Sequence, residues 1–273
     1  MIVDGKAIAE DLKRELTKKV YDISYKNGLV LQLIMVGANP VTERFVAVKK
    51  KFAADVGVSI IEHRLPKNST TAEAVAAVKS AAQAGGGIVV QLPLPASIDT
   101  QTVLNAIPVS ADVDVLSDAA CAQFEAGTLP ILPPVAGAIS EILLRYGVSV
   151  VGKKAVVIGQ GRLVGKPSAL WLKRAGAHVV AADEHTGNIR VLTEDVDIIV
   201  SGAGVPHLIK PEMVKEGVAL LDAGTSEQGG KTVGDIDPSC AEKASLFTET
   251  PGGIGPVTVA MLFKNLLALT MKG

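Results

Sequence analysis

The chain has 273 residues, of which 48% are hydrophobic but only 3% aromatic, and its formal net charge is −1. This length fits one large or two small α/β domains, and a core so poor in aromatic residues must be built from aliphatic side chains, as buried parallel sheets usually are. A charge near zero excludes a chain-wide field that attracts nucleic acid or an anionic membrane. We therefore expect no nucleic-acid or membrane partner, and recognition at a local site.

The two cysteines, Cys121 and Cys240, are far apart in the chain. They predict neither a disulfide framework nor a cysteine zinc site, so we interpret both as reduced thiols and expect no metal. The start, Met1 to Gly5, lacks the basic and then apolar pattern of a signal peptide, and no apolar stretch approaches about 18 residues. A cytoplasmic protein is the resulting prediction.

The first part of the chain alternates between helical and strand patterns. A helix is predicted from Asp4 to Asn27, ended by Gly28, because one apolar stripe recurs at helical spacing: Ile8, Leu12, Leu16, Val20 and Ile23. Further helices are expected at 41–56, 70–84 (capped by Ser69 or Thr70) and 100–107, and strands at 29–36, 58–65 and 87–91. Such alternation predicts a parallel sheet.

The pattern restarts after an irregular stretch. Residues 129–134 are rich in proline and are the best candidate for a crossing between domains. Beyond them we expect helices at 135–146, 167–175 and 256–271, and strands at 154–158, 178–182, 196–201 and 218–222. A second α/β domain is therefore predicted.

A glycine turn joins the strand at 154–158 to the next helix. Gly159, Gly161 and Gly165 follow the spacing Gly-x-Gly-x-x-x-Gly, one residue longer than the usual dinucleotide fingerprint. Glycines let the backbone approach a pyrophosphate closely, and the helix N-terminus supplies free N–H groups. We interpret the turn as a dinucleotide site; the alternative is a plain glycine-rich loop.

The strand after this turn ends at Asp183 and Glu184. A carboxylate there accepts hydrogen bonds from the adenosine ribose and repels a 2′-phosphate, which favours NAD over NADP. The counter-argument is local basic charge, because Arg162, Lys166 and His185 together suit a phosphate. A solvated strand end is the other interpretation of the two acids.

Lys49 shares one face of the helix at 41–56 with Phe45 and Phe52. An ammonium partly desolvated among aromatic rings has a lowered pKa and suits proton chemistry. For an isolated lysine, a stem that covers apolar surface while the charge stays in water is the commoner arrangement.

Three further segments are candidates for a ligand site. Gln91 ends a strand and is followed by Leu92-Pro93-Leu94-Pro95, where the prolines prevent any continuation. A side chain at the carboxyl end of a parallel strand points into the crevice where ligands bind. Asp112-Val113-Asp114 follows a connection on the same side, and the glycine-rich turn in 250–258 lets a flat ligand lie against backbone.

In combination these segments resemble the bifunctional methylenetetrahydrofolate dehydrogenase/cyclohydrolase family over essentially the whole chain. The matching segments are 37–40, Phe45 with Lys49, 90–95, 112–114, the Gly159 turn, 233–235 and 251–256. The resemblance implies two α/β domains: a folate-binding catalytic domain of residues 1–117 plus 256–273, to which the last helix returns, and a Rossmann-like NAD(P)-binding domain of residues 118–255. It also implies a folate cleft between them and a homodimer formed through the nucleotide domains.

The resemblance implies oxidation of 5,10-methylenetetrahydrofolate with NAD or NADP, then hydrolysis of the methenyl product to 10-formyltetrahydrofolate. It implies that Lys49 transfers protons, that Gln91 is the hydrogen-bonding partner of Lys49, and that Asp114 contacts the edge of the pterin. Substrate contacts are implied for Phe45, Pro251, Gly252 and Gly253. The dinucleotide contacts expected from the turn and the resemblance together are Gly159, Gln160, Gly161, Arg162, Gly165, Asp183, Glu184, Gly224, Thr225 and Thr258.

The chain departs from the family pattern at four places. Phe45 replaces a tyrosine, 132–135 lacks the usual Cys and Thr, Val115 replaces a glycine, and Asp183-Glu184 replace more neutral or basic residues. These departures leave two alternatives: a monofunctional NAD-dependent methylenetetrahydrofolate dehydrogenase with weak or absent cyclohydrolase activity, and a non-catalytic folate- or nucleotide-binding homologue. A dehydrogenase for an unrelated small molecule is the remaining enzyme alternative.

Overall fold

The computed structural model describes residues 1–24, 28–37 and 39–271. It divides into two compact units. The first, here called the glycine-turn unit, comprises Met1–Ala9 and Val135–Thr258; the second, here called the lysine unit, comprises Glu10–Pro134 and Val259–Gly273. Helices α1 (Gly5–Ser24) and α9 (Ile254–Thr270) each contain a boundary between the units.

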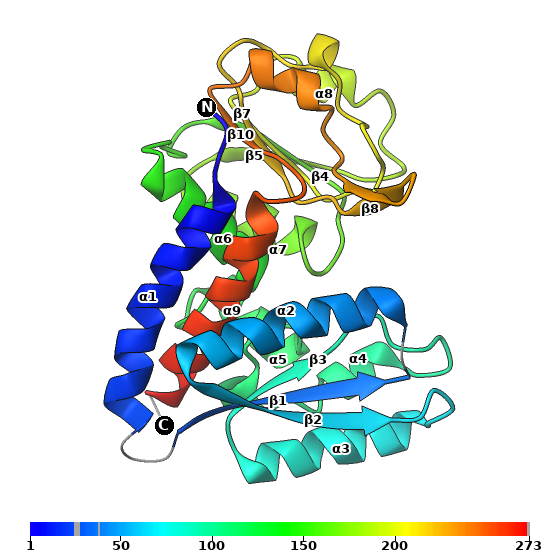
Figure 1. Ribbon diagram of the computed structural model, residues 1–273. Helices are drawn as coiled ribbons and strands as arrows, with labels where there is room; N and C mark the ends of the chain where they lie inside the picture. The colour runs from blue at the N-terminus through cyan, green and yellow to red at the C-terminus, as the bar shows by residue number, and fades with distance from the viewer. Residues whose placement is uncertain (25–27, 38, 272–273) are drawn as a thin grey trace. The chain divides into compact units, whose positions relative to one another are not determined.

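The lysine unit is built on a three-stranded parallel sheet of order β2-β1-β3. Its strands are β1 (Leu29–Val36), β2 (Val58–Leu65) and β3 (Gly87–Val90). Figure 1 shows α2 (Pro40–Val56) on one face of this sheet and α3 (Thr71–Ala84) on the other. The connection after β3 carries α4 (Thr100–Leu104), the 3-10 turn η1 (Val109–Ala111) and α5 (Asp118–Ala126).

Local signals fix the ends of the helices in this unit. The Asn39 side chain accepts a hydrogen bond from the Thr42 N–H at the start of α2, and Gly57 ends that helix in the left-handed conformation. Thr70 and Glu73 form a capping box at the start of α3. The local sequence therefore specifies both ends of α2 and the start of α3.

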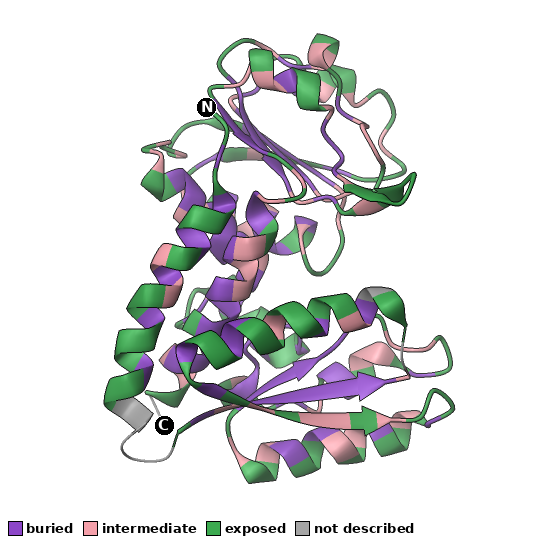
Figure 2. Ribbon diagram, in the orientation of Figure 1, coloured by how far each residue is buried: buried purple, intermediate pink, exposed green. Residues whose placement is uncertain are grey.

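The three strands of this sheet differ in burial. The central strand β1 and the edge strand β3 are buried along almost their whole length, whereas the other edge strand, β2, is mostly half-buried or exposed (Figure 2). α9 returns to the lysine unit: Phe263 stacks on Phe52 of α2 with ring centroids 5.0 Å apart. In addition, the buried Asn265 amide donates to the carbonyls of Val113 and Leu132.

The glycine-turn unit contains a five-stranded parallel sheet of order β10-β7-β6-β4-β5. The strands are β4 (Lys154–Ile158), β5 (His178–Ala182), β6 (Ile198–Ser201), β7 (Ala219–Asp222) and β10 (Leu246–Thr248). The unit also holds α6 (Pro134–Arg145), α7 (Gly165–Arg174), α8 (Arg190–Thr193), the hairpin β8 (Ser226–Gln228) and β9 (Lys231–Val233), and the 3-10 turns η2 (Pro211–Met213) and η3 (Pro238–Glu242). Its core is almost wholly aliphatic, with Phe247 as an aromatic member.

The predicted α/β class with parallel sheets is confirmed. Strands 29–36, 58–65, 154–158 and 178–182 have the predicted bounds. The helix predicted at 100–107 already ends at Leu104, and α5 and the β8–β9 hairpin were not predicted. The end predicted for the first helix, 25–27, lies outside the described residues, as does Ala38 of the segment 37–40. Within the described part of the chain, no helix is both long and apolar enough to cross a membrane.

Candidate functional site

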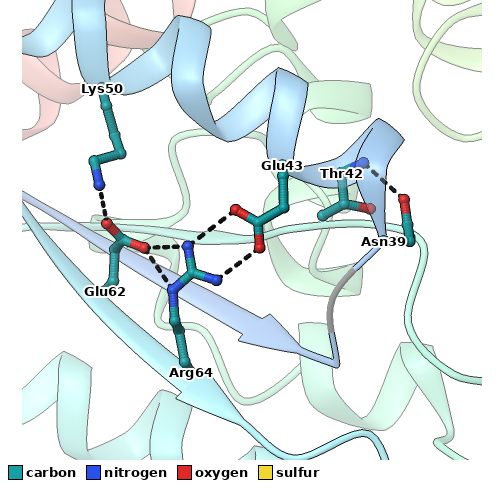
Figure 3. Close-up of polar contacts among 6 residues, drawn as sticks. All are labelled: Asn39, Thr42, Glu43, Lys50, Glu62 and Arg64. Carbon is teal, nitrogen blue, oxygen red and sulfur yellow. Dashed lines mark hydrogen bonds and ion pairs between the residues drawn. The ribbon is translucent and has the colours of Figure 1, made fainter.

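Helix α2 presents Lys49 and is anchored along its outer side. Arg64 of β2 contacts both carboxylate oxygens of Glu43 on α2, and Lys50 of α2 pairs with Glu62 of β2 (Figure 3). Arg64 also bonds to Glu62, which joins the pairs into one network. The hydrogen bond from Arg64 lowers the pKa of Glu43. Exposed ion pairs of this kind contribute little to stability, but together they connect α2 to β2.

Lys49 forms a specific hydrogen bond inside the lysine unit. Its Nζ donates to Oε1 of Gln91 over 2.8 Å. Gln91 is 7% exposed, lies directly beyond β3, and donates through Nε2 to the Leu92 carbonyl. Because an ammonium can only donate and a carbonyl can only accept, these two bonds fix which way the Gln91 amide faces. The half-buried lysine is therefore held by a buried partner and does not extend freely into solvent.

The electrostatics of Lys49 and Asp114 suit proton transfer. Burial lowers the pKa of Lys49, although the nearby Asp114 carboxylate opposes the shift. Burial also raises the pKa of Asp114 to about 6, against the attraction of Lys49. Each group thus titrates closer to neutrality than it does in water, which is the property that general acids and bases need.

Asp114 lies in a tight turn held by Asp112. The buried Asp112 carboxylate accepts hydrogen bonds from the N–H groups of Leu116 and Ser117. Val115 has φ +58°, the left-handed conformation that glycine adopts readily and β-branched residues rarely do. Since the Val115 side chain is also buried, the turn keeps a glycine-like backbone while its side chain packs in the core.

The two aromatic residues on the face of Lys49 have different surroundings. Phe52 is only 7% exposed because it stacks on Phe263, whereas Phe45 is 49% exposed. Of the two residues, only Phe45 is exposed to solvent. The sequence pattern placed both on one helical face, but the return of α9 buries one of them.

Thr42 is a candidate ligand-binding residue that the sequence did not indicate. Its Oγ1 is buried and has no hydrogen-bond partner among the described residues, while its N–H is capped by Asn39 (Figure 3). Thr42 precedes Lys49 by two helical turns, so both lie on the same side of α2. That spacing, i and i+7, was the signal that would have drawn attention to it.

The glycine turn of the other unit is closely packed. Gly159 follows β4 with φ +85°, and a Cβ on Gly165 would lie 1.6 Å from the Gly159 carbonyl oxygen. A Cβ on Gly159 would in turn lie 2.5 Å from the Gly202 carbonyl oxygen, beyond the end of β6. Gly161, by contrast, is exposed, and a Cβ there would meet nothing within 4 Å. The turn therefore needs two glycines for its own packing and leaves the third open to a ligand.

The remaining candidates in this unit surround the carboxyl ends of its strands. Gln160 donates to the carbonyls of Val157 and Gly159, which stiffens the turn, and Arg162 is exposed. Gly224 is buried just after β7, while Thr225 is exposed. Thr258 lies on α9, where its hydroxyl donates to the Ile254 carbonyl.

Asp183 and Glu184 lie at the end of β5. Asp183 Oδ1 accepts hydrogen bonds from the His185 N–H and the Thr186 hydroxyl. The bond from His185 contributes most to lowering the pKa of Asp183, so this carboxylate is ionised at neutral pH. Glu184 is exposed.

The turn at 251–253 is packed against the start of α1. A Cβ on Gly5 would lie 1.8 Å from the Gly253 carbonyl oxygen. Gly252 has φ +115°, and the Gly253 N–H donates to the Glu249 carbonyl. The close approach of two backbone segments explains why glycines are needed there. Across the described ranges 1–24, 28–37 and 39–271, no group of three or more His, Cys, Asp or Glu side chains is placed to hold a metal ion.

Two family profiles together match nearly the whole chain. The one described as “Tetrahydrofolate dehydrogenase/cyclohydrolase, catalytic domain” matches residues 3–114. The one described as “Tetrahydrofolate dehydrogenase/cyclohydrolase, NAD(P)-binding domain” matches residues 133–272. Lys49, Gln91 and Asp114 fall in the first region and the glycine turn in the second.

Relatives and solved structures agree with these profiles. “Bifunctional protein FolD” of Methanococcoides burtonii is 36% identical, with 99% of this chain and 96% of that protein covered. The structure of bifunctional FolD from Campylobacter jejuni superposes with a TM-score of 0.97 at 33% identity, covering 100% of this chain and 99% of that one. The Trypanosoma brucei enzyme, solved with NADP and an inhibitor, gives 0.94 at 34% identity and covers 100% and 97%.

Proposed function

The chain belongs to the tetrahydrofolate dehydrogenase/cyclohydrolase family, and we infer that it oxidises 5,10-methylenetetrahydrofolate and hydrolyses the methenyl product to 10-formyltetrahydrofolate. The observation that carries this inference is the Lys49–Gln91 hydrogen bond beside Asp114, inside the region that matches the catalytic domain. A bound nicotinamide dinucleotide supplies the hydride acceptor for the first reaction.

Lys49 is proposed to move the protons of the hydrolytic step. Water that attacks the methenyl carbon must lose a proton, and the ring nitrogen that leaves must gain one. An amine whose pKa is lowered by burial exchanges protons at neutral pH more readily than an ordinary lysine. Gln91, which accepts from Nζ over 2.8 Å, is proposed to keep the amine in one position during this exchange.

Asp114 is proposed to bind the amino-pyrimidine edge of the pterin. An ionised carboxylate accepts two parallel hydrogen bonds from such an edge. Because the pKa of Asp114 is about 6, the carboxylate is protonated below that pH and loses this capacity. Phe45 is proposed to offer its exposed ring to the aminobenzoyl group, and Pro251, Gly252 and Gly253 to supply backbone for a flat ligand to lie against.

An assay with separate substrates tests the proposed function. Given 5,10-methylenetetrahydrofolate and a dinucleotide, the purified protein is expected to form the methenyl compound; given the methenyl compound alone, it is expected to open the ring faster than buffer does. Methenyl formation without accelerated opening would favour the monofunctional alternative. Absence of both activities, with tetrahydrofolate still bound in calorimetry, would favour the non-catalytic homologue.

NAD is proposed as the preferred cofactor. The glycine turn fits a dinucleotide, because Gly161 leaves open space and Gly165 permits the close packing of turn and helix. The ionised Asp183 at the end of β5 suits ribose hydroxyls and repels a 2′-phosphate. We expect kcat/KM to be at least about tenfold higher with NAD, since one unfavourable charge contact costs roughly 1.4 kcal/mol or more. The T. brucei relative was solved with NADP, so both cofactors must be compared, and a strong NADP preference would refute this proposal.

A homodimer formed through the edge of the five-stranded sheet is also proposed. β5 is the last strand in that sheet, and its Val180 is 47% exposed. An exposed apolar edge strand is a template for pairing with a second chain. Light scattering should therefore give a dimer for the native protein and a monomer for Val180→Lys. A native monomer at micromolar concentration would contradict the proposal.

A further inference from the structure

Two aspartates of the glycine-turn unit, Asp222 and Asp235, are completely buried. Asp235 belongs to the matching segment 233–235, and no role has been assigned to either residue above. Asp222 ends β7 and is 1% exposed; Asp235 follows β9 and is 0% exposed. No lysine, arginine or histidine in the described part of the chain forms an ion pair with either carboxylate. Burial raises the pKa of Asp222 to about 6, and the charge of Asp235 adds to the shift. Buried carboxylates without a cation are costly unless other donors compensate.

The donors that compensate Asp235 come from one loop. Its Oδ2 accepts from the Ser201 hydroxyl at 2.8 Å and from the Ala203 and Gly204 N–H groups at 2.6 and 3.3 Å. Its Oδ1 accepts from the Val205 N–H at 3.0 Å. Successive N–H groups that converge on one point form an anion-binding nest, the arrangement that often holds phosphate. Here the protein's own carboxylate fills the nest, so the loop after β6 is already folded around its anion.

Asp222 links this nest to the neighbouring loop. Its Oδ1 accepts from the N–H groups of Gly224 at 3.0 Å and of Asp235 at 3.1 Å. Its Oδ2 accepts from the Ile236 N–H at 2.9 Å. Asp222 therefore fixes the backbone that carries Asp235 and, with the same carboxylate, the turn after β7.

Two glycines show how tightly the carboxylates are enclosed. A Cβ on Gly224 would lie 2.1 Å from Asp235 Oδ1, and a Cβ on Gly234 would lie 1.9 Å from Asp222 Oδ2. Neither clash involves the flexible end of a long side chain, because both carboxylates are held by several hydrogen bonds. Glycine at 224 and 234 is therefore required by the aspartates, independently of any ligand.

The loop that Asp235 holds lies where a dinucleotide is expected. β4 lies between β5 and β6, so the chain changes direction in the sheet at the carboxyl ends of β4 and β6. Ligands of open parallel sheets bind at such a point. The loop also contacts the glycine turn directly, because a Cβ on Gly159 would meet the Gly202 carbonyl oxygen and the Ala203 nitrogen.

We propose that Asp235, held in place by Asp222, is a positioning residue for dinucleotide binding: it fills the backbone nest of 203–205 and so preorganises the loops after β6 and β7. This proposal rests on the proposed dehydrogenase function. A loop already ordered before binding loses less conformational entropy when the cofactor arrives, which strengthens binding without any direct contact. The N–H groups of this nest already donate to Asp235, so they are not free to bind the cofactor phosphates.

Asp235→Asn tests the proposal because it keeps the shape but replaces one acceptor oxygen with a donor. We expect the dissociation constants for NAD and NADP, measured by calorimetry, to rise at least about tenfold, the equivalent of losing one good hydrogen bond to a charged group. Hydrolysis of added 5,10-methenyltetrahydrofolate, which uses no dinucleotide, should stay within about twofold of the native rate. Ser201→Ala, which removes a single donor, should weaken dinucleotide binding a few-fold and keeps the test available if Asp235→Asn does not fold.

Asp237→Asn is the matched control. Its carboxylate lies two residues further on and caps Ser239 locally, so dinucleotide binding should be unchanged. Native-like dinucleotide binding in both Asp235→Asn and Ser201→Ala would overturn the proposal. It would also be overturned if the dehydrogenase and cyclohydrolase activities of the variants both fell in proportion to the fraction of protein that is folded. Failure of the proposed function itself would look different, because the native protein would then bind no dinucleotide.

Discussion

Replacing Lys49 by methionine is expected to abolish most of the cyclohydrolase activity while leaving the protein folded. Methionine preserves the length and apolar stem of the side chain but cannot move a proton. A positioned acid or base contributes about 10²–10⁴-fold, so the rate of methenyl opening should fall by that factor. Hydride transfer from the methylene compound requires no proton transfer, so the dehydrogenase rate should fall less. The two initial rates, measured on one preparation, check the difference.

Lys50→Met is the matched control for this experiment. Lys50 is the next residue on the same helix, but its ammonium pairs with Glu62 on the outer side of α2 (Figure 3). Removing an exposed pair changes the free energy of unfolding by about 1 kcal/mol or less, and both activities should remain native. If Lys49→Met opened the methenyl compound at the native rate, Lys49 would not be the proton-transfer group. A separate result, a native protein that lacks both activities, would support the non-catalytic alternative.

Replacing Gly165 by alanine is expected to destroy the proposed dinucleotide site. The new Cβ would lie 1.6 Å from the Gly159 carbonyl oxygen, and both atoms belong to backbone that the packing of β4 and α7 holds in place. Overpacking typically costs about 1–3 kcal/mol and more when backbone must move. The turn should therefore open, and the dissociation constant for NAD should rise by at least about tenfold. Calorimetry and the thermal midpoint together report this change.

Two other glycines separate packing from ligand contact. Gly187→Ala introduces a Cβ with no atom within 4 Å and should change neither the thermal midpoint nor the dissociation constant. Gly161→Ala also has open space in the protein, so the thermal midpoint should stay native while dinucleotide binding weakens. Unimpaired NAD binding by Gly165→Ala would show that the turn does not hold the cofactor.

Two of the departures from the family pattern, Val115 and Phe45, lie close to Asp114 and Lys49 in the sequence. Val115 has the left-handed backbone that glycine adopts readily, and its side chain is buried beside the turn that carries Asp114. Phe45 has an exposed ring but no hydroxyl that could bond to Lys49. The Lys49 ammonium instead donates a hydrogen bond to Gln91. The proposed hydrolytic centre therefore has a lysine held in position even with phenylalanine at position 45.

Local chemistry explains which elements were predicted well. β1 and β2 are bounded by glycine and proline signals, and α3 begins at a capping box, so short-range sequence suffices to place them. β8, β9 and β10 are strands of three residues; β8 and β9 pair with each other across a short turn, whereas β10 pairs with the distant β7. Such short runs carry no periodic signal, which is why they were not predicted.

The sequence by itself determined the α/β class, the glycine turn and, through its motifs, the candidates Lys49, Gln91 and Asp114. Periodicity, caps and glycine spacing act within a few residues, so they can be read along the chain. The family resemblance already implied Gln91 as the hydrogen-bonding partner of Lys49, and the tertiary structure supplied the geometry of that bond. Only the tertiary structure distinguished the exposed Phe45 from the buried Phe52. It also enclosed Asp222 and Asp235 beneath the loops of the second sheet. These outcomes depend on burial and on contacts between distant segments, which no local pattern encodes.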